Sequence, residues 1–128
     1  MAQNPMVLVV DDDEMHLLLL KHFFTSAGIA ASCVSNGEDA LEEIAARSFS
    51  FLITDVNMPR MNGFELAKKA KQLAPQMLIA LCTGDNFPSV RSLAAETGID
   101  TVFNKPVDYR KMVATVTDEI QKLALAGC

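Results

Sequence analysis

The stretch that decides the fold is FLITDVNMPRMNG, residues 51–63. Its opening residues, FLIT, are typical of a strand that is covered on both faces. A carboxylate, Asp55, follows at once, and a loop containing Pro59 and Gly63 then leads into a helical pattern. A polar loop does not require an aspartate at this point, so the ends of the other strands become informative.

The rest of the chain alternates short apolar runs with amphipathic stretches. The apolar runs predict strands at 6–10, 30–34, 50–54, 77–81 and 101–104. The amphipathic stretches predict helices at 14–27, 37–47, 63–74, 88–97 and 109–126. Strict alternation is typical of a parallel sheet with right-handed crossovers and helices on both faces. The sequence therefore predicts an α/β fold, and no repeat or linker indicates a second domain.

The first predicted helix carries more apolar residues than one helix face can hold. Its expected core-facing residues are Met15, Leu18, Leu19, Phe23 and Ala27. The run LLLL at 17–20 covers more than one face, so one leucine must be partly exposed, and we expect this to be Leu20 or Leu17. We expect His16 and His22 to be solvated helix residues rather than phospho-carriers or ligands.

Composition and charge exclude several classes of protein. The 128 residues suffice for one domain with a real core, and the net charge of -5 argues against a non-specific nucleic-acid binder or a membrane-surface anchor. The three cysteines are widely spaced and form no CxxC pair, which favours a reducing compartment and gives no zinc signature. The N-terminus lacks the features of a signal peptide, and no apolar run approaches membrane-spanning length. We therefore expect a cytoplasmic protein.

Polar and charged residues stand at the ends of four predicted strands. They are Asp11, Asp12 and Asp13 after the first, Asp55 after the third, Thr83 after the fourth, and Lys105 with Pro106 after the fifth. In an open parallel α/β sheet, ligands bind beyond the carboxyl ends of the strands. We expect these side chains to meet at one end of the sheet and form a site.

Such a site favours phosphoryl chemistry. Converging carboxylates repel one another, and a hard cation such as Mg²⁺ removes the conflict because it prefers oxygen ligands. Lys105 adds a compact positive charge, and Thr83 can donate a hydrogen bond to a phosphoryl oxygen. A carboxylate can itself accept a phosphoryl group as an acyl phosphate. Asp55 is the best-placed acceptor, since Asp11 and Asp12 are adjacent and suited to the metal.

Four short motifs resemble the receiver domain of two-component response regulators, the CheY-like superfamily. They are VVDD (9–12), DVNMPRMNG (55–63), CTG (82–84) and NKP (104–106). The resemblance implies a flavodoxin-like (βα)5 fold, a doubly wound five-stranded parallel sheet with strand order 2-1-3-4-5. We expect residues 1–128 to form a single receiver domain, with its core at about 6–125 and no output domain in the chain.

The resemblance also implies roles for the acidic residues. Asp55 falls at the phosphoacceptor position, and Asp12 falls where the family binds Mg²⁺ directly. Asp11 is expected to reach the metal through water. Asn57 falls where the family gives its backbone carbonyl to the metal. Asn57 and Asp85 are expected to flank the path of the water that hydrolyses the acyl phosphate.

Other matched positions concern the switch. Thr83 and Lys105 fall at the phosphoryl-contacting hydroxyl and lysine, and Pro106 falls where the family commonly has a cis peptide bond. The family often has an aromatic residue three positions before the lysine, but here that residue is Val102. The neighbouring Phe103 should point to the opposite side of the strand.

Because Val102 cannot make the swing of an aromatic ring, the expected readout is displacement of the loop 83–89, with Gly84 permitting movement and Phe87 offering an apolar contact. The implied partners are a sensor histidine kinase or histidine phosphotransfer protein, and a downstream protein at the face formed by the fourth helix, fifth strand and fifth helix. Neither direct nucleic-acid binding nor membrane binding is expected.

The implied function is that of a signalling phosphoacceptor with slow self-catalysed dephosphorylation, rather than an enzyme. A degenerate receiver that acts as a phosphorylation-independent interaction module is the alternative, and the intact acidic pair, acceptor, hydroxyl and lysine weigh against it. A metal-dependent phosphohydrolase would need an acid two residues after Asp55, where Asn57 stands. A flavin or dinucleotide binder is weaker still, because no glycine-rich fingerprint follows the first strand.

Overall fold

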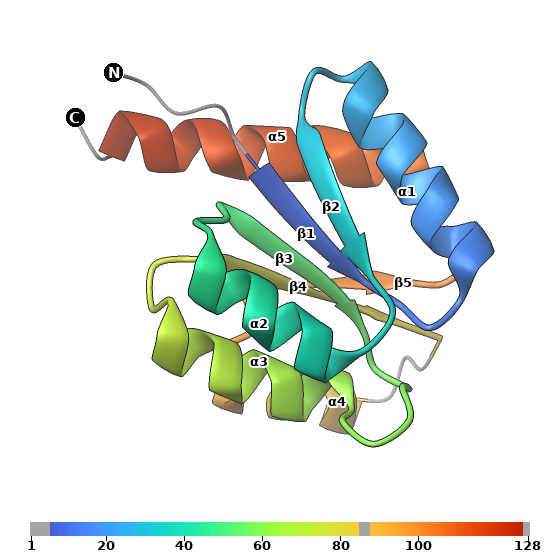
Figure 1. The fold of residues 1–128 in the computed structure, drawn as a ribbon, viewed down its shortest axis with the longest axis vertical. Helices are drawn as coiled ribbons and strands as arrows, with labels where there is room; N and C mark the ends of the chain where they lie inside the picture. The colour runs from blue at the N-terminus through green and yellow to red at the C-terminus, as the bar shows by residue number, and fades with distance from the viewer. Residues whose placement is uncertain (1–5, 85–87, 127–128) are drawn as a thin grey trace.

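The chain forms one five-stranded parallel sheet with the strand order β2-β1-β3-β4-β5. The computed structural model describes residues 6–84 and 88–126 (Figure 1). The strands are β1 (Met6–Val10), β2 (Ala30–Val34), β3 (Phe51–Asp55), β4 (Leu78–Thr83) and β5 (Thr101–Asn104). The predicted α/β class and strand order are confirmed.

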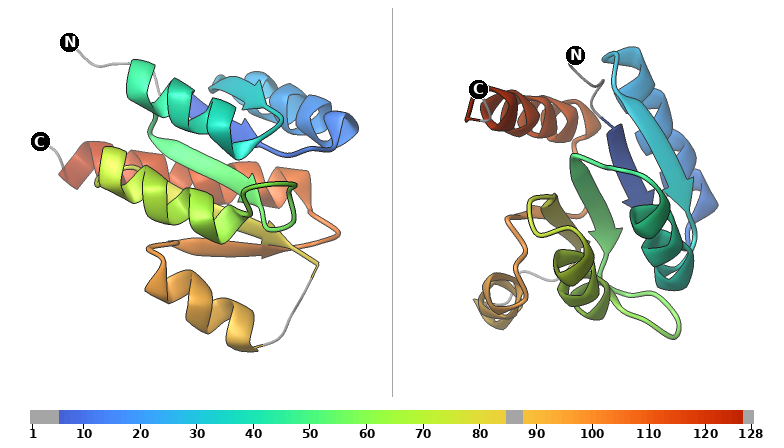
Figure 2. Two further views of the ribbon diagram at one scale, coloured as in Figure 1. Left: turned by 60° about the horizontal axis from the view of Figure 1, so that its bottom comes forward. Right: turned by 60° about the vertical axis from the view of Figure 1, so that its left-hand side comes forward.

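Helices cover both faces of this sheet. They are α1 (Glu14–Ser26), α2 (Gly37–Ala46), α3 (Gly63–Leu73), α4 (Pro88–Glu96) and α5 (Tyr109–Ala126). Helices α1 and α5 lie on one face, and α2, α3 and α4 lie on the other (Figures 1 and 2). The bounds of β1, β2, β5 and α5 are those predicted, and the other helices end one residue earlier than predicted.

Two strands run further toward the functional end of the sheet than predicted. Strand β3 includes Asp55, which pairs in register with Cys82 of β4. Strand β4 continues to Thr83, which pairs with Asn104 of β5. Asp55 and Thr83 are therefore the last paired residues of their strands, whereas Asp11, Asp12 and Lys105 follow theirs directly.

The helix starts follow local hydrogen-bonding chemistry. Asp13 is the N-cap of α1 and its carboxylate accepts from the backbone N–H of Met15 at 3.0 Å. Asn36 caps α2 in the same way. At the start of α3, Asn62 and Glu65 form a reciprocal capping box. These caps fix where each loop at the carboxyl end of the sheet turns into a helix.

The predicted core face of α1 is wrong. Leu17, Leu20 and Phe24 are its buried residues, whereas Met15 and Leu18 are both 64% exposed. The prediction that Leu17 or Leu20 would be the exposed leucine is wrong for the same reason. A run of four leucines fits either stripe, and the fully buried ring of Phe24 determines which stripe faces the sheet.

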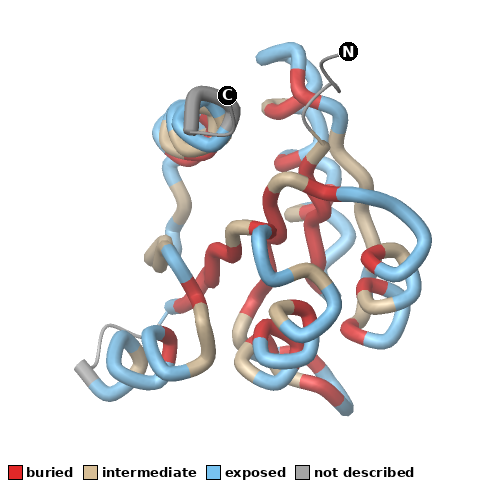
Figure 3. The backbone as a smooth tube through the Cα atoms, turned by 90° about the vertical axis from the view of Figure 1, so that its left-hand side faces the viewer, coloured by how far each residue is buried: buried red, intermediate tan, exposed pale blue. Residues whose placement is uncertain are grey.

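The sheet divides the core into two apolar clusters. One lies between the sheet and α2, α3 and α4, and the other between the sheet and α1 and α5. Every residue of β3 is buried, while β2, at one edge, is only partly covered. Figure 3 shows this as buried central strands with exposed outer helix surfaces. Among the described residues, no helix has both the length and the apolar character needed to cross a bilayer.

Candidate functional site

Three carboxylates from two strand ends meet at one end of the sheet. Asp11 and Asp12 follow β1, and Asp55 ends the neighbouring strand β3. One oxygen from each of the three lies within 4.8 Å of the others. Asp11 and Asp55 are 2% and 7% exposed, while Asp12 is open to solvent. The structure thus brings together acidic residues from different parts of the sequence.

Asp55 is bound by a lysine from the end of β5. The Nζ atom of Lys105 lies 2.9 Å from Oδ1 of Asp55, and the backbone N–H of Val56 donates to the same oxygen at 3.0 Å. Burial raises the pKa of Asp55, and the nearby charge of Asp11 raises it further, although the bond from Lys105 opposes both. The same ion pair raises the pKa of Lys105 against the opposing effect of burial. Lys105 is therefore held as a cation beside Asp55.

Asp11 has partners on both of its carboxylate oxygens. The backbone N–H of Asp13 donates to Oδ1 at 3.0 Å, and Nδ1 of His16 contacts Oδ2. Burial acts to raise the pKa of Asp11, but the hydrogen bonds from His16 and Asp13 and the positive charges nearby outweigh it, so the pKa is lowered. Asp11 and Asp55 therefore have opposite pKa shifts within one cluster.

The backbone under Asp55 leaves no room for a side chain at Gly63. A Cβ atom added to Gly63 would lie 2.3 Å from the carbonyl oxygen of Asp55 and 2.9 Å from Cδ1 of Leu81. The N–H of Gly63 donates to the carbonyl of Val56 at 2.9 Å, and the hydroxyl of Thr54 donates to the carbonyl of Asp55 at 3.0 Å. Gly63 is thus required for close approach of the loop, and hydrogen bonds and close packing hold the main chain of Asp55 and Val56 in place.

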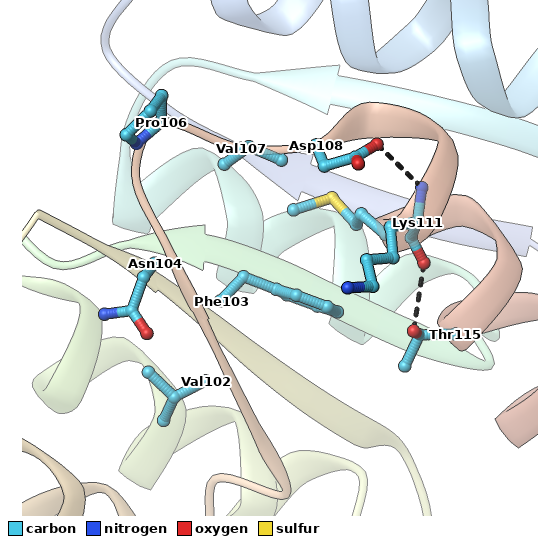
Figure 4. A pocket seen from close by; sticks show the side chains of 9 residues that line it. Val102, Phe103, Asn104, Pro106, Val107, Asp108, Lys111 and Thr115 are labelled. Carbon is cyan, nitrogen blue, oxygen red and sulfur yellow. Dashed lines mark hydrogen bonds between the residues drawn. The ribbon is translucent and has the colours of Figure 1, made fainter.

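The remaining predicted switch residues lie along β4 and β5. Thr83 is buried, and its carbonyl accepts from the backbone N–H of Lys105 at 2.8 Å, which ties the two strand ends together. The peptide bond from Lys105 to Pro106 is cis. Val102 packs against the α2–α4 side of the sheet and Phe103 against the α1–α5 side, so their side chains leave β5 in opposite directions (Figure 4).

Three further predicted residues lie in the chain after β3 and β4. Asn57, whose backbone carbonyl is the predicted ligand, is exposed in the loop after β3. Asp85 and Phe87, predicted for the water path and the switch loop, lie outside the described residues.

His16 was not predicted as a site residue, and its expected solvation is wrong. Its side chain is only 11% exposed, and it contacts Asp11 directly. The N-cap at Asp13 turns the chain so that the first helical turn folds back over the end of β1, which brings residue 16 beside residue 11. Hydrophobic periodicity does not indicate this contact. The signal in the sequence is the spacing, because His16 lies only five residues after Asp11, close enough for a hydrogen bond.

The cluster fits a hard divalent cation. Such ions take oxygen ligands, and Mg²⁺ in particular combines one or two carboxylates with water and substrate oxygens. The three carboxylates offer oxygens that lie within 4.8 Å of one another, and two of the three are buried where their mutual repulsion is poorly screened. A bound cation would compensate this charge. The donor set therefore agrees with a magnesium site.

Comparison with known proteins gives the family. A model of the response regulator receiver domain matches residues 7–117. The sensor histidine kinase RcsC of Escherichia coli is 30% identical over 112 residues, which cover 88% of this chain and 12% of the kinase. The Vibrio harveyi protein LuxN, an autoinducer 1 sensor kinase/phosphatase, is 36% identical over 66% of this chain and 10% of its own length. The chain thus spans about a tenth of the length of these relatives.

Solved structures agree with the sequence match. The Vibrio cholerae chemotaxis protein CheY4 superposes with a TM-score of 0.86 at 25% identity, covering 91% of this chain and 98% of that chain. A CheY-like response regulator receiver domain protein from Methanospirillum hungatei gives a TM-score of 0.89 at 25% identity, covering 94% and 96% of the two chains. With five parallel strands in the order 2-1-3-4-5 and an acidic cluster at their carboxyl ends, this chain belongs to the response regulator receiver domain family.

Proposed function

We propose that this chain is an active receiver, in which Asp55 accepts a phosphoryl group from a histidine kinase or a histidine phosphotransfer protein in a reaction that requires Mg²⁺. The observation that carries the proposal is the surroundings of Asp55. Its carboxylate is bound by Lys105 at 2.9 Å and lies within 4.8 Å of two further carboxylates. An oxygen nucleophile with a fixed cation on one side and an acidic cluster on the other is suited to phosphoryl transfer.

The transfer involves one bond made and one bond broken. A carboxylate oxygen of Asp55 attacks the phosphorus of a phosphohistidine, the P–N bond breaks, and the imidazole nitrogen keeps the electron pair. The product is an acyl phosphate on Asp55. Lys105 would neutralise negative charge on the transferred group, and the Thr83 hydroxyl would donate to one of its oxygens.

The metal would be held by this chain's own oxygens. We assign direct contacts to Asp12, Asp55 and the backbone carbonyl of Asn57, with Asp11 reaching the ion through water. When bound, Mg²⁺ supplies positive charge that lowers the repulsion between the acidic cluster and the incoming phosphoryl group. Asn57 and Asp85 would flank the approach of the water that slowly hydrolyses the acyl phosphate.

The output face that we propose is formed by α4, β5 and α5. Arg91 of α4 donates to Oδ1 of Asn104 on β5 at 3.2 Å, so α4 is tied to the strand that leads to Lys105. A pocket of about 340 Å³ between β5 and the start of α5, lined by Phe103, Asn104 and Lys111 among others, offers a hollow for a partner (Figure 4). Val102 is too short to repeat the swing of an aromatic ring. The loop from Thr83 to the start of α4 would therefore carry the change.

The proposal is tested by phosphorylation with a small donor. The full chain is incubated with acetyl phosphate and Mg²⁺, and intact-mass spectrometry should show one added phosphoryl group, whereas a chain whose metal is chelated before the donor is added should show none. Asp55→Asn should not be labelled. Asp100→Asn is the matched control, because Asp100 also pairs with a lysine, at 3.4 Å, but lies at the other end of the sheet.

Two results would contradict the proposal. Equal labelling of Asp55→Asn would assign the acceptor elsewhere. A wild-type chain that stays unlabelled by both acetyl phosphate and a phosphorylated phosphotransfer domain would favour the degenerate receiver. The domain assignment, with residues 1–128 acting as one receiver unit, rests on the same labelling result.

A further inference from the structure

His16 connects the acidic cluster to the start of α5. Its Nδ1 atom contacts Oδ2 of Asp11, and its side chain is 11% exposed against 3% for that of Asp11. The other carboxylate oxygen of Asp11 accepts from the backbone of Asp13. Rotation of the Asp11 carboxylate would break one or both of these contacts, so His16 and the loop backbone together fix its orientation.

Aromatic packing in turn holds His16 in place. The imidazole lies 5.6 Å from the ring of Tyr109, at an interplanar angle of 56°. Tyr109 then stacks on Phe23 of α1, with ring centroids 5.2 Å apart and planes only 3° from parallel. Tyr109 is the first residue of α5. A continuous row of side chains therefore runs from Asp11 through His16 to the contact between α1 and α5.

A side chain that hydrogen-bonds to a metal-binding carboxylate and orients it has a measurable effect on metal affinity. Loss of a group that orients a direct ligand typically weakens binding by about 10-fold to 100-fold. Asp11 is expected to reach the ion through water, so we expect an effect at the lower end of this range. Asp11 is nearly fully buried, so few other donors can replace His16. The tilted ring contact also means that a shift of His16 would change the surroundings of Tyr109.

We propose that His16 is a positioning residue, which holds Asp11 for the metal through Nδ1 and couples occupancy of the acidic cluster to Tyr109 through its ring. This inference rests on the proposed function, because it assumes that the cluster binds Mg²⁺. It differs from the expected route through Thr83 and β5, since it leads to the α1–α5 side of the sheet. The two roles of His16 use different atoms, so they can be separated by substitution.

Substitution by asparagine and by leucine separates these roles. His16→Asn keeps an N–H donor near the position of Nδ1 but removes the ring. His16→Leu removes both the donor and the ring. Lys21→Leu is the control, because Lys21 is an exposed residue of the same helix, whereas the ring of His22 contacts Phe23 and is therefore unsuitable. Thermal melts of all variants show whether each is folded before binding is measured.

Tyr109 provides a built-in reporter. It is the chain's single tyrosine and there is no tryptophan, so intrinsic emission reports on this residue. Affinity is measured separately, with Mn²⁺ as the probe ion, from the loss of the free-ion signal in electron paramagnetic resonance.

In the wild type and in Lys21→Leu, Mg²⁺ should change Tyr109 emission along a saturable curve. His16→Leu should bind Mn²⁺ about 10-fold more weakly, whereas His16→Asn should stay within about threefold of the wild type. Both His16 variants should lose the response of Tyr109 emission to Mg²⁺ at saturating metal.

The outcomes distinguish this inference from the proposed function. Wild-type affinity in a folded His16→Leu, or an equal loss in His16→Asn, would overturn the role of the donor. A full emission response in His16→Asn would overturn the role of the ring. A wild-type chain that bound no Mn²⁺ would overturn the magnesium site and this inference together, whereas normal wild-type binding and labelling at Asp55 would leave the proposed function standing.

Discussion

Two lysine–aspartate pairs stand at opposite ends of the same sheet. Lys105 and Asp55 meet at the carboxyl end, with Nζ and Oδ1 2.9 Å apart. Lys71 and Asp100 meet at the amino end, with Nζ and Oδ2 3.4 Å apart. The residue types are identical, yet the groups around each pair differ.

The pair at the amino end is bound into the backbone. Oδ2 of Asp100 also accepts from the N–H of Ile79 at 2.9 Å, and Lys71 donates to the carbonyl of Met77 at 2.8 Å. Both charges therefore satisfy groups at the start of β4 and join α3 to the beginning of β5. An ion pair whose two charges also hydrogen-bond to the backbone has a structural role.

The Lys105–Asp55 pair at the carboxyl end instead has two further negative charges beside its aspartate. Asp11 and Asp12 approach Asp55 within 4.8 Å, and burial together with the charge of Asp11 raises the pKa of Asp55. Such an arrangement costs stability unless another cation enters. The surroundings of an ion pair, rather than its two residues, therefore distinguish a candidate reactive site from a structural ion pair.

The largest expected effect comes from removing each lysine in turn. Lys105→Ala should slow phosphorylation by acetyl phosphate by about 10-fold to 100-fold, because a fixed positive charge at the reacting group is lost. Lys71→Ala should phosphorylate at the wild-type rate but lose about 1–2 kcal/mol of unfolding free energy, because a backbone carbonyl and Asp100 lose their donor. Rates come from intact-mass time courses and stabilities from urea titration. If the two substitutions slowed phosphorylation equally, Lys105 would have no special role in the reaction.

A second prediction concerns the backbone beneath Asp55. Gly63→Ala should reduce the unfolding free energy by about 1–3 kcal/mol, because the new Cβ would lie 2.3 Å from the carbonyl oxygen of Asp55. Gly84→Ala is the control, since no atom of the described residues lies within 4 Å of the corresponding Cβ position. Urea titration measures both. If the two substitutions cost the same, the close packing of the acceptor's main chain is not required.

A third prediction tests the repulsion among the carboxylates. Mg²⁺ should stabilise the wild-type chain by about 1.4 kcal/mol at a concentration about ten times its Kd. Asp12→Ala should melt at or above the wild-type temperature without metal, since repulsion is relieved, and should lose the response to Mg²⁺. Glu42→Ala, at an exposed glutamate of α2, should keep that response. Melting curves that ignore millimolar Mg²⁺ would count against a metal site here.

The smallest expected effect is a difference in pH dependence between Asp55 and Asp11. The pKa of Asp55 is raised above its ordinary 3.8, so the folded chain binds more protons there and its stability falls as pH rises through the window just above that value. The unfolding free energy of Asp55→Asn should therefore rise relative to that of the wild type as pH rises through the same window. The pKa of Asp11 is lowered, so its contribution is present above 3.8 and is lost as pH falls through the lowered value. The unfolding free energy of Asp11→Asn should thus fall relative to that of the wild type as pH rises through the window below 3.8. Urea titrations across acidic pH measure both differences. If the two variants changed in the same direction relative to the wild type, the opposite pKa shifts would be refuted.

Much of this architecture was predictable because strand ends carry their own signal. Asp11, Asp12 and Asp55 follow apolar runs directly, and parallel pairing forces those ends together. The orientation of α1 was not predictable from its leucine run, since Phe24 decides which stripe is buried. The contact between His16 and Asp11 depends on the N-cap geometry and on Tyr109, which lies more than ninety residues away in sequence. Periodicity carries no information about either.

The division of the core by the sheet bears on how the sequence can vary. Leu20 packs on the α1–α5 side and Leu66 on the α2–α4 side, with the buried strands between them. Substitutions at sites that share no neighbours usually have additive free energies. The two apolar clusters can therefore accumulate substitutions independently. The sequence of one cluster can diverge while the other keeps its packing. Double-mutant cycles within one cluster should show coupling, whereas cycles across the sheet should not.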